Sequence, residues 1–135
     1  MTAPKTVLVV DDAAEIRELL ADLILRPSGY RVLTAASGSA GLEAARAQSP
    51  DVVISDIKMP DLTGIELTEI LRRERPSLPV ILITAEGSEE VARQALRAGA
   101  IDYYPKPFDP DEMLATLARV LAEPVAAPQI GRAHV

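Results

Sequence analysis

Side chains able to bind a cation or a phosphoryl group follow several short apolar runs of the sequence. They are Asp11 and Asp12, then Asp56, then Thr84 with Glu86, and finally Lys106. Carboxylates gathered in one place raise one another's pKa unless a positive charge joins them. Lys106 and a hard divalent cation are the two candidates for that charge. Because Mg²⁺ binds one or two carboxylates together with waters and phosphate oxygens, these residue types suit magnesium-assisted phosphoryl transfer.

Asp56 is the candidate nucleophile, because a carboxylate can accept a phosphoryl group as an acyl phosphate. It ends the stretch VVISD, in which an apolar strand pattern closes on a single carboxylate. Each of these positions also has an ordinary alternative, since aspartates and threonines cap helices and turns and most lysines are solvated. Their recurrence at four successive strand ends favours one shared site.

Strands and helices that alternate along the chain would bring these side chains together. The predicted strands are residues 6–10, 31–35, 51–55, 80–83 and 101–104, and a helical pattern follows each of them. Such alternation predicts a doubly wound α/β fold, in which helices cover both faces of a five-stranded parallel sheet. The first, third and fourth strands are the most apolar and are expected inside the sheet, with the fifth at an edge. Ligands of such sheets bind at the carboxyl ends of the strands.

Local signals mark several helix ends. Thr63 and Glu66 form a capping-box pattern, and a helix over 88–98 is expected to end at Gly99. Another helix is expected over 40–48 and a last one from Asp109. On the first helix, one apolar face is predicted from Ile16, Leu19, Leu20, Leu23 and Ile24. On the last helix, the predicted inward residues are Met113, Leu114, Leu117, Val120 and Leu121.

The composition narrows the classes of function. The chain has 135 residues, 48% of them hydrophobic and 25% charged, which fits one globular domain. Its net charge of -6 argues against nonspecific binding of this domain to nucleic acid, and the lack of cysteine excludes disulfides and thiolate chemistry. No apolar run reaches the roughly 20 residues of a membrane span, and no signal-peptide pattern follows Lys5. We therefore expect a soluble cytoplasmic protein.

The C-terminal residues differ from the rest. Residues 124–135, PVAAPQIGRAHV, lose the helical pattern. We expect a single domain over 1–123 and then a flexible Pro/Ala-rich tail or linker remnant.

Four motifs make the sequence resemble the receiver domain of bacterial two-component response regulators. They are VLVVDD at 7–12, VVISDIKMPDLTG at 52–64, LITA at 82–85 and DYYPKPF at 102–108. The resemblance extends over about residues 5–123, nearly the whole chain. It implies a flavodoxin-like (βα)5 fold with the strand order 2-1-3-4-5, for which receiver proteins are a known example.

The resemblance also implies a role for the acidic positions. Asp56 would accept a phosphoryl group from a phosphohistidine of a sensor kinase, in a reaction that requires Mg²⁺. Asp11 and Asp12 would hold the Mg²⁺ together with Asp56, with Asp12 as the more direct ligand of the acidic pair. The backbone carbonyl of Lys58 would complete the protein's share of the coordination.

Three further positions match the family pattern. Lys106 would pair with Asp56 before phosphorylation and contact the phosphoryl oxygens afterwards, and its bond to Pro107 is expected to be cis. Thr84 would move toward the phosphoryl group, and the ring of Tyr103 would fill the vacated space. The surface formed by the fourth helix, fifth strand and fifth helix would then change shape and control an output domain or a partner.

Neighbouring positions refine this assignment. Tyr104 is expected to point to the opposite side of the strand from Tyr103, because side chains alternate along a strand. Lys58 and Glu86 lie two residues beyond Asp56 and Thr84, where family members vary. Their opposite charges suggest an ion pair across the mouth of the site. Our hypothesis is that this pair hinders attacking water and slows loss of the phosphoryl group.

The resemblance implies partners as well. A sensor histidine kinase or a phosphotransfer protein would donate the phosphoryl group, docking near Glu15 and Glu18 on the first helix. An output domain or a target protein would respond, and a phosphorylation-linked homodimer is possible. The domain would be a signalling switch that promotes only its own phosphoryl transfer and dephosphorylation, with no contact to membranes or direct contact to nucleic acid.

Three alternative interpretations fit the sequence less well. A phosphatase of the haloacid dehalogenase type would need a second aspartate where Lys58 stands. A dinucleotide-binding domain would need glycines in the turn DDAAEI, which has none. A receiver-like module that docks partners without being phosphorylated would usually lack one of the site residues, all of which are present here.

Overall fold

Five parallel strands lie in the order β2-β1-β3-β4-β5 in the computed structural model, which describes residues 3–122. The strands are β1 (Thr6–Val10), β2 (Arg31–Ala35), β3 (Val52–Asp56), β4 (Val80–Thr84) and β5 (Asp102–Pro105). All neighbouring strands are parallel. The predicted fold and strand order are confirmed, with β1, β3 and β4 inside the sheet and β5 at one edge. Asp56 and Thr84 are the last residues of their strands.

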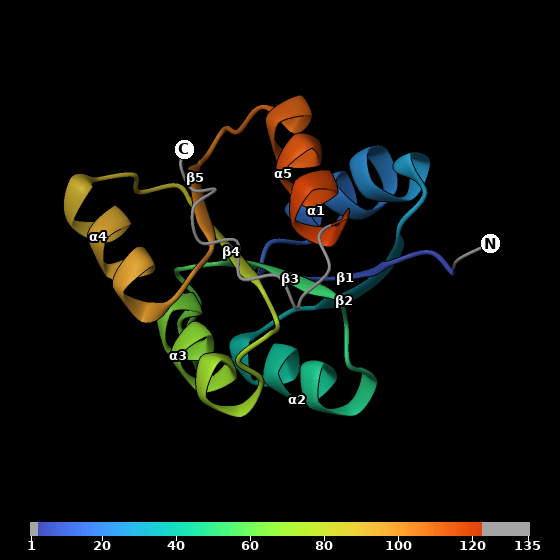
Figure 1. Ribbon diagram of the computed structural model, residues 1–135. Helices are drawn as coiled ribbons and strands as arrows, with labels where there is room; N and C mark the ends of the chain where they lie inside the picture. Colours follow the sequence, from blue (N-terminus) through green and yellow to red (C-terminus); the bar gives the residue numbers. More distant parts are fainter. Residues whose placement is uncertain (1–2, 123–135) are drawn as a thin grey trace.

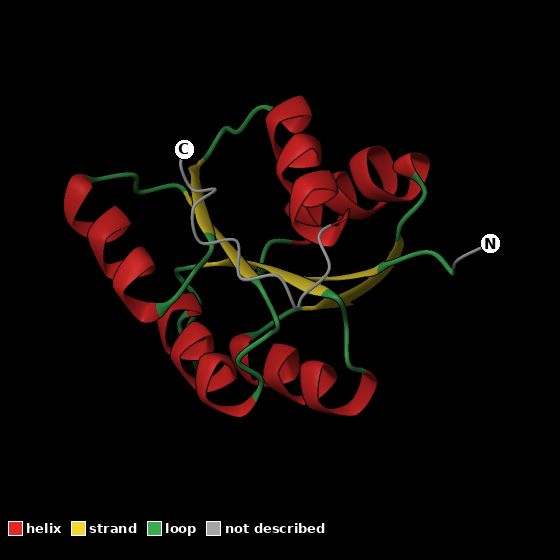
Figure 2. Cartoon of the chain, in the orientation of Figure 1, coloured by secondary structure: helices red, strands yellow, loops and turns green. Residues whose placement is uncertain are grey.

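Helices cover both faces of the sheet (Figures 1 and 2). They are α1 (Ala14–Glu18), η1 (Leu19–Leu25), η2 (Arg26–Ser28), α2 (Gly38–Gln48), α3 (Gly64–Glu74), α4 (Glu89–Ala98) and α5 (Pro110–Ala122). In Figure 1, α1 and α5 lie on one side of the sheet, and α2 and α3 lie on the other. The side chains of α4 join the core on the side of α2 and α3.

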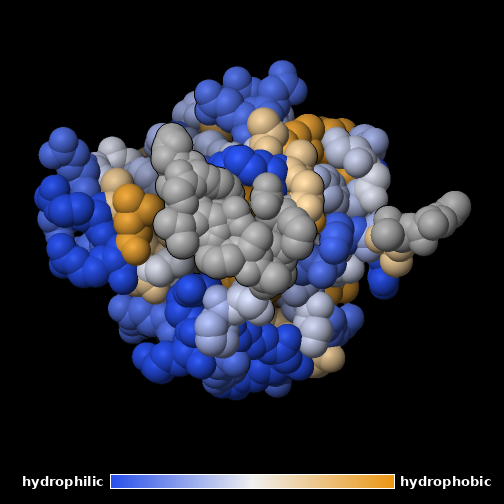
Figure 3. Space-filling model, in the orientation of Figure 1, coloured by the Kyte–Doolittle hydropathy of each residue, from blue (hydrophilic) through white to orange (hydrophobic). Residues whose placement is uncertain are grey.

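The core is divided by the sheet into two clusters. Leu8 and Val10 of β1 belong to the cluster under α2, α3 and α4, whereas Val7 and Val9 belong to the cluster under α1 and α5. All four side chains are fully buried. Continuous apolar strands follow from this arrangement, because helices shield both faces of the sheet. Outside the grey residues, the surface visible in Figure 3 is mostly polar, with small apolar patches beside α4 and α5.

The predicted helix caps form. The amide of Glu66 donates to Oγ1 of Thr63 at 3.1 Å, and the amide of Thr63 donates to Oε1 of Glu66 at 3.0 Å, which completes the capping box of α3. Ser88 caps α4 through the amide of Val91, and Gly99 ends that helix with a φ of 106°. Gly99 supplies the left-handed conformation that most residues avoid.

The first helix differs from the prediction. Leu20 and Ile24 are buried as expected, but Leu19 and Leu23 are exposed, Leu23 to 71%. The chain changes to a π-helix over η1, where hydrogen bonds join residues five apart, so residues that would share a face of an α-helix separate around the axis. Ala21 and Leu25 take the buried places instead.

Smaller differences concern α5 and the chain ends. Met113 and Leu117 are fully buried, whereas the other residues predicted to face inward are half-buried: Leu114, Val120 and Leu121. Thr116 is buried beside them. The tail predicted at 124–135 lies outside the described residues. Within residues 3–122, no helix combines the length and the apolar character needed to cross a membrane.

Candidate functional site

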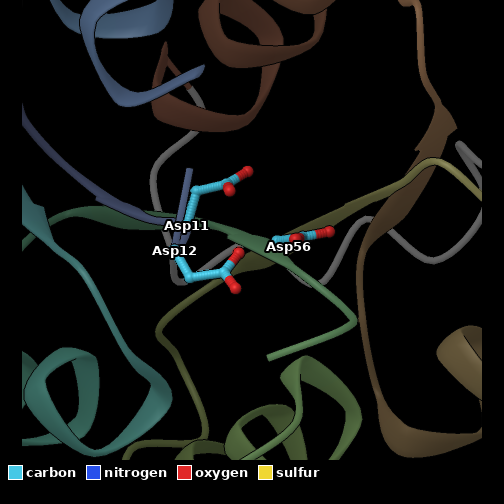
Figure 4. Close-up of side chains that lie close together, drawn as sticks. All are labelled: Asp11, Asp12 and Asp56. Carbon is cyan, nitrogen blue, oxygen red and sulfur yellow. The ribbon is translucent and has the colours of Figure 1, made fainter. Parts of the chain in front are cut away.

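Asp11, Asp12 and Asp56 converge at the carboxyl ends of β1 and β3 (Figure 4). One carboxylate oxygen from each lies within 4.8 Å of the others. β1 and β3 are neighbours in the sheet, and Val10 is paired with Ser55, so the residues that follow this pair leave the sheet side by side. Asp11 and Asp56 are buried, whereas Asp12 is exposed.

Lys106 reaches this cluster from the end of β5. Its Nζ lies 3.1 Å from Oδ2 of Asp11 and 3.6 Å from Oδ1 of Asp56. Its backbone amide donates to the carbonyl of Thr84 at 2.7 Å, and its bond to Pro107 is cis. The ammonium group is therefore shared between two carboxylates, with the shorter contact to Asp11.

The electrostatics of the cluster favour an additional cation. Burial is the main cause that raises the pKa of Asp56, and the negative charge of Asp11 raises it further, while Lys106 lowers it. Three carboxylates and one ammonium leave two negative charges uncompensated. A hard divalent cation would balance them, and an all-oxygen donor set is the type that Mg²⁺ prefers. The residues present thus fit a magnesium site.

Asp11 serves the local backbone as well as the cluster. Its Oδ1 accepts a hydrogen bond from the amide of Ala13 at 2.9 Å, just before α1 begins. Its own amide donates to the carbonyl of Ala35 on β2 at 3.1 Å, and its carbonyl accepts from Nη1 of Arg17 at 2.8 Å. Asp11 therefore stabilises the turn before α1 and does not cap the helix, whose N-cap is Ala13 and has no side-chain cap hydrogen bond. Its second carboxylate oxygen faces Lys106.

The loop after Asp56 turns sharply and is held close to the strand end. The amide of Ile57 donates to the carbonyl of Ile83 at 3.0 Å, and the amide of Gly64 donates to the carbonyl of Ile57 at 2.8 Å. A Cβ atom on Gly64 would lie 2.2 Å from the carbonyl oxygen of Asp56. Only glycine fits that approach, so Gly64 shapes the site although it offers no functional group. In the sequence, the signal for this role is the glycine that ends the stretch VVISDIKMPDLTG at 52–64.

Lys58 and Glu86 face each other across the exposed rim. Nζ of Lys58 lies 2.8 Å from Oε2 of Glu86, and both side chains are more than half exposed. The hydrogen bond that Lys58 donates to Glu86 is the main cause that raises the pKa of Lys58. Thr84 is buried, and its Oγ1 accepts the amide of Glu86 at 3.1 Å. Within residues 3–122, this hydroxyl donates no hydrogen bond.

Tyr103 and Tyr104 lie on opposite faces of β5. Tyr103 packs against the core cluster under α2, α3 and α4, and its hydroxyl is buried without a hydrogen-bond partner among the described residues. Gly87 leaves room for that hydroxyl, since a Cβ atom there would be 3.1 Å from it. Tyr104 packs on the other cluster, and its hydroxyl is hydrogen-bonded to Oγ1 of Thr116. The expected alternation of the two rings is confirmed.

The chain is similar to known signalling proteins. A model of the family described as response regulator receiver domain matches residues 7–118. The chain is 42% identical over 118 residues to the probable transcriptional regulatory protein TcrX of Mycobacterium tuberculosis, covering 87% of this chain and 50% of that protein. It is 40% identical over 116 residues to the DNA-binding transcriptional regulator NtrC of Escherichia coli K12, covering 86% of this chain and 24% of that protein.

A solved structure agrees with these matches. The chemotaxis protein CheY4 of Vibrio cholerae aligns with a TM-score of 0.81 and 38% identity, covering 88% of this chain and 100% of that one. The chain spans half the length of TcrX and about a quarter of NtrC.

Proposed function

Because the chain belongs to the response regulator receiver domain family, we propose that it is a phosphorylation-activated switch whose phosphoacceptor is Asp56. The observation that carries this proposal is the position of Asp56, buried at the end of β3 between an acidic pair and Lys106. A structural turn aspartate would need neither neighbour. The chain is a signalling domain of two-component systems. The phosphohistidine donor, the Mg²⁺ ion and the switch that follows phosphorylation are proposals.

Each residue of the cluster has its own role in phosphoryl transfer. A carboxylate oxygen of Asp56 attacks the phosphorus atom, and the bond between phosphorus and the donor histidine breaks, which leaves an acyl phosphate and a free imidazole. Lys106, 3.6 Å from the nucleophile, stabilises the negative charge on the phosphoryl oxygens. Its present contact with Asp11 keeps the ammonium oriented before the donor arrives.

Asp11, Asp12, Asp56 and the backbone carbonyl of Lys58 would hold a Mg²⁺ ion. No hydrogen bond among the described residues occupies the carbonyl of Lys58, so its oxygen is free for a ligand. When bound, Mg²⁺ neutralises charge on the carboxylates and on the phosphoryl oxygens.

Thr84 and Tyr103 form the proposed switch. Thr84 ends β4 beside Asp56, because Ile83 is paired with Asp56 in the register of β3 and β4. A phosphoryl group on Asp56 would add three acceptor oxygens. The Thr84 hydroxyl can donate a hydrogen bond to one of them, and this bond would draw Thr84 toward Asp56. Tyr103, on the neighbouring strand, has a buried hydroxyl that finds no hydrogen-bond partner within residues 3–122, and its ring packs against the core cluster. The change would pass to the surface of α4, β5 and α5 and so to an output domain or a target protein.

A phosphohistidine donor would dock on α1 and on the segment after β5. An apolar hollow of about 300 Å³ lies there, lined by Ile16, Leu19, Lys106, Pro107, Phe108 and Pro110. Lys106 lines the hollow and also contacts Asp56, so a protein seated in it would stand next to the phosphoacceptor. A sensor histidine kinase or a phosphotransfer protein is the proposed occupant.

The chemical nature of the modified residue tests the proposal. After incubation with a small-molecule phosphodonor and Mg²⁺, the phosphoryl group should be removed by hydroxylamine, which cleaves acyl phosphates. It should be absent from an Asp56→Asn variant. A phosphoryl group that resists hydroxylamine, or one that persists in the variant, would contradict the assignment of Asp56. No incorporation under any condition would favour a receiver that only docks partners.

A further inference from the structure

Asp61, in the loop between β3 and α3, binds the N-terminus of α2. Its Oδ1 accepts the amide of Gly38 at 3.2 Å, and its Oδ2 accepts the amide of Ser39 at 3.1 Å and the Ser39 hydroxyl. The same carboxylate accepts the amide of Leu62 at 2.7 Å. The donors on α2 lie 22 and 23 positions away in the sequence, so Asp61 links two distant segments.

Charge and packing both support this link. A carboxylate at a helix N-terminus is stabilised by the unpaired amides and the helix dipole. The hydrogen bond from the Ser39 hydroxyl is the main cause that lowers the pKa of Asp61 to about 2. Loop and helix also touch directly, since a Cβ atom on Gly38 would lie 2.1 Å from the carbonyl oxygen of Leu62.

The link joins the two sides of the candidate magnesium site. On one side, the amide of Asp11 is bonded to the carbonyl of Ala35, three residues before Gly38. On the other side, Lys58 lies three residues before Asp61. The segment that carries the acidic pair and the loop that carries Lys58 are therefore connected through α2, in addition to their connection through the sheet.

We propose that Asp61 is a positioning residue that holds the β3–α3 loop in place for the binding of Mg²⁺ and the phosphoryl group. This inference rests on the proposed function. A loop that is ordered before binding does not lose that conformational entropy when the ligand arrives. Without Asp61, the Lys58 carbonyl would occupy its binding position for a smaller fraction of time, and the apparent affinity would fall by that fraction.

Ser37 offers a matched control. Its Oγ accepts the amide of Ala40 at 3.1 Å, so it caps the same helix, and within residues 3–122 its side chain has no hydrogen bond to the loop. The Asp61→Ala and Ser37→Ala variants each remove a cap from α2, but only the first releases the loop. An Asp61→Asn variant retains acceptor capacity and provides an intermediate case.

The experiment measures Mg²⁺ affinity directly, by titrating each folded variant with Mg²⁺ and following backbone amide resonances. Urea unfolding of each variant verifies the fold. We expect Asp61→Ala to raise the dissociation constant about five-fold or more, Asp61→Asn to raise it less, and Ser37→Ala to leave it within about two-fold of wild type.

Two outcomes would overturn the inference. Equal affinities in Asp61→Ala and Ser37→Ala would show that Asp61 is only a helix cap, while wild-type binding of Mg²⁺ would leave the proposed function intact. A wild-type protein that binds no Mg²⁺ would contradict the proposed function itself, and the role of Asp61 would fall with it.

Discussion

Nζ of Lys106 lies closer to Asp11, at 3.1 Å, than to the proposed phosphoacceptor Asp56, at 3.6 Å. One ammonium group thus contacts two buried carboxylates, so the negative charges of Asp11 and Asp56 are not both compensated. The ionised form of Asp56 is therefore unfavourable, and burial and the proximity of Asp11 both raise its pKa. Binding of a cation, or replacement of this carboxylate by an uncharged group, would remove the unfavourable charge interaction.

Asp56→Asn should therefore stabilise the metal-free protein. The substitution removes one negative charge from the cluster and leaves Lys106 to pair with Asp11. We expect the free energy of unfolding at pH 7 to rise by roughly 0.5–2 kcal/mol in urea titrations with EDTA present. Adding Mg²⁺ should narrow the gap, because wild type gains the ion that the variant binds less well. A variant less stable than wild type in EDTA would contradict the electrostatic argument.

The stability difference should also depend on pH. The pKa of Asp56 is raised in the folded state above its ordinary value of 3.8, so the folded protein binds this proton more tightly than the unfolded chain. Wild type therefore loses stability relative to Asp56→Asn as the pH rises from below 3.8 through the raised pKa. Urea unfolding at a series of pH values should show a gap that is smallest at the acidic end. A gap that widens toward acid would reverse the sign and exclude this explanation.

Lys58→Ala should shorten the lifetime of the phosphorylated protein. The ion pair with Glu86 crosses the rim of the site, and its loss opens a path for water to the acyl phosphate. We expect phosphoryl loss, followed by intact mass, to accelerate several-fold.

The matched control is Arg26→Ala, which breaks another exposed ion pair, with Asp22, away from the site. Both variants should leave the urea midpoint of unfolding close to that of wild type, because exposed surface pairs contribute little to stability. Equal phosphate lifetimes in Lys58→Ala and wild type would remove the proposed role of the pair.

The two adjacent tyrosines should respond differently to loss of their hydroxyl groups. Tyr104→Phe breaks the hydrogen bond to Thr116 and should cost about 1 kcal/mol of stability. Tyr103→Phe removes a buried hydroxyl that has no partner among the described residues, so it should be neutral or slightly stabilising. Urea unfolding of both variants, measured together, gives the two changes in the free energy of unfolding. A loss for Tyr103→Phe as large as that for Tyr104→Phe would mean that the Tyr103 hydroxyl is bonded in solution.

Much of the fold follows from local patterns. The apolar runs predict the parallel strands, and the Thr63–Glu66 pair predicts the capping box that opens α3. The polar residues at strand ends predict the cluster of Asp11, Asp12 and Asp56 with Lys106, because parallel strands deliver their carboxyl ends to one edge. These features depend on periodicity and chain order, which a single sequence displays.

Other features depend on tertiary contacts that no local pattern reveals. The π-helix after α1 changes which side chains are buried, and Leu23 becomes exposed. The link from Asp61 to α2 joins segments more than 20 residues apart, so a sequence window around either segment misses it. The requirement for glycine at Gly64 comes from the approach of the Asp56 carbonyl, which becomes visible in three dimensions.

The most direct test of the central claim is the intact mass of the protein after incubation with a small phosphodonor and Mg²⁺. Asp56→Asn and an EDTA-treated sample serve as controls. The proposed function predicts a single added phosphoryl group in wild type and none in either control. An adduct that forms in EDTA or in Asp56→Asn would contradict the claim that Asp56 accepts the group with the help of a cation. A protein that takes up neither a phosphoryl group nor its mimic beryllium fluoride would be a docking module instead.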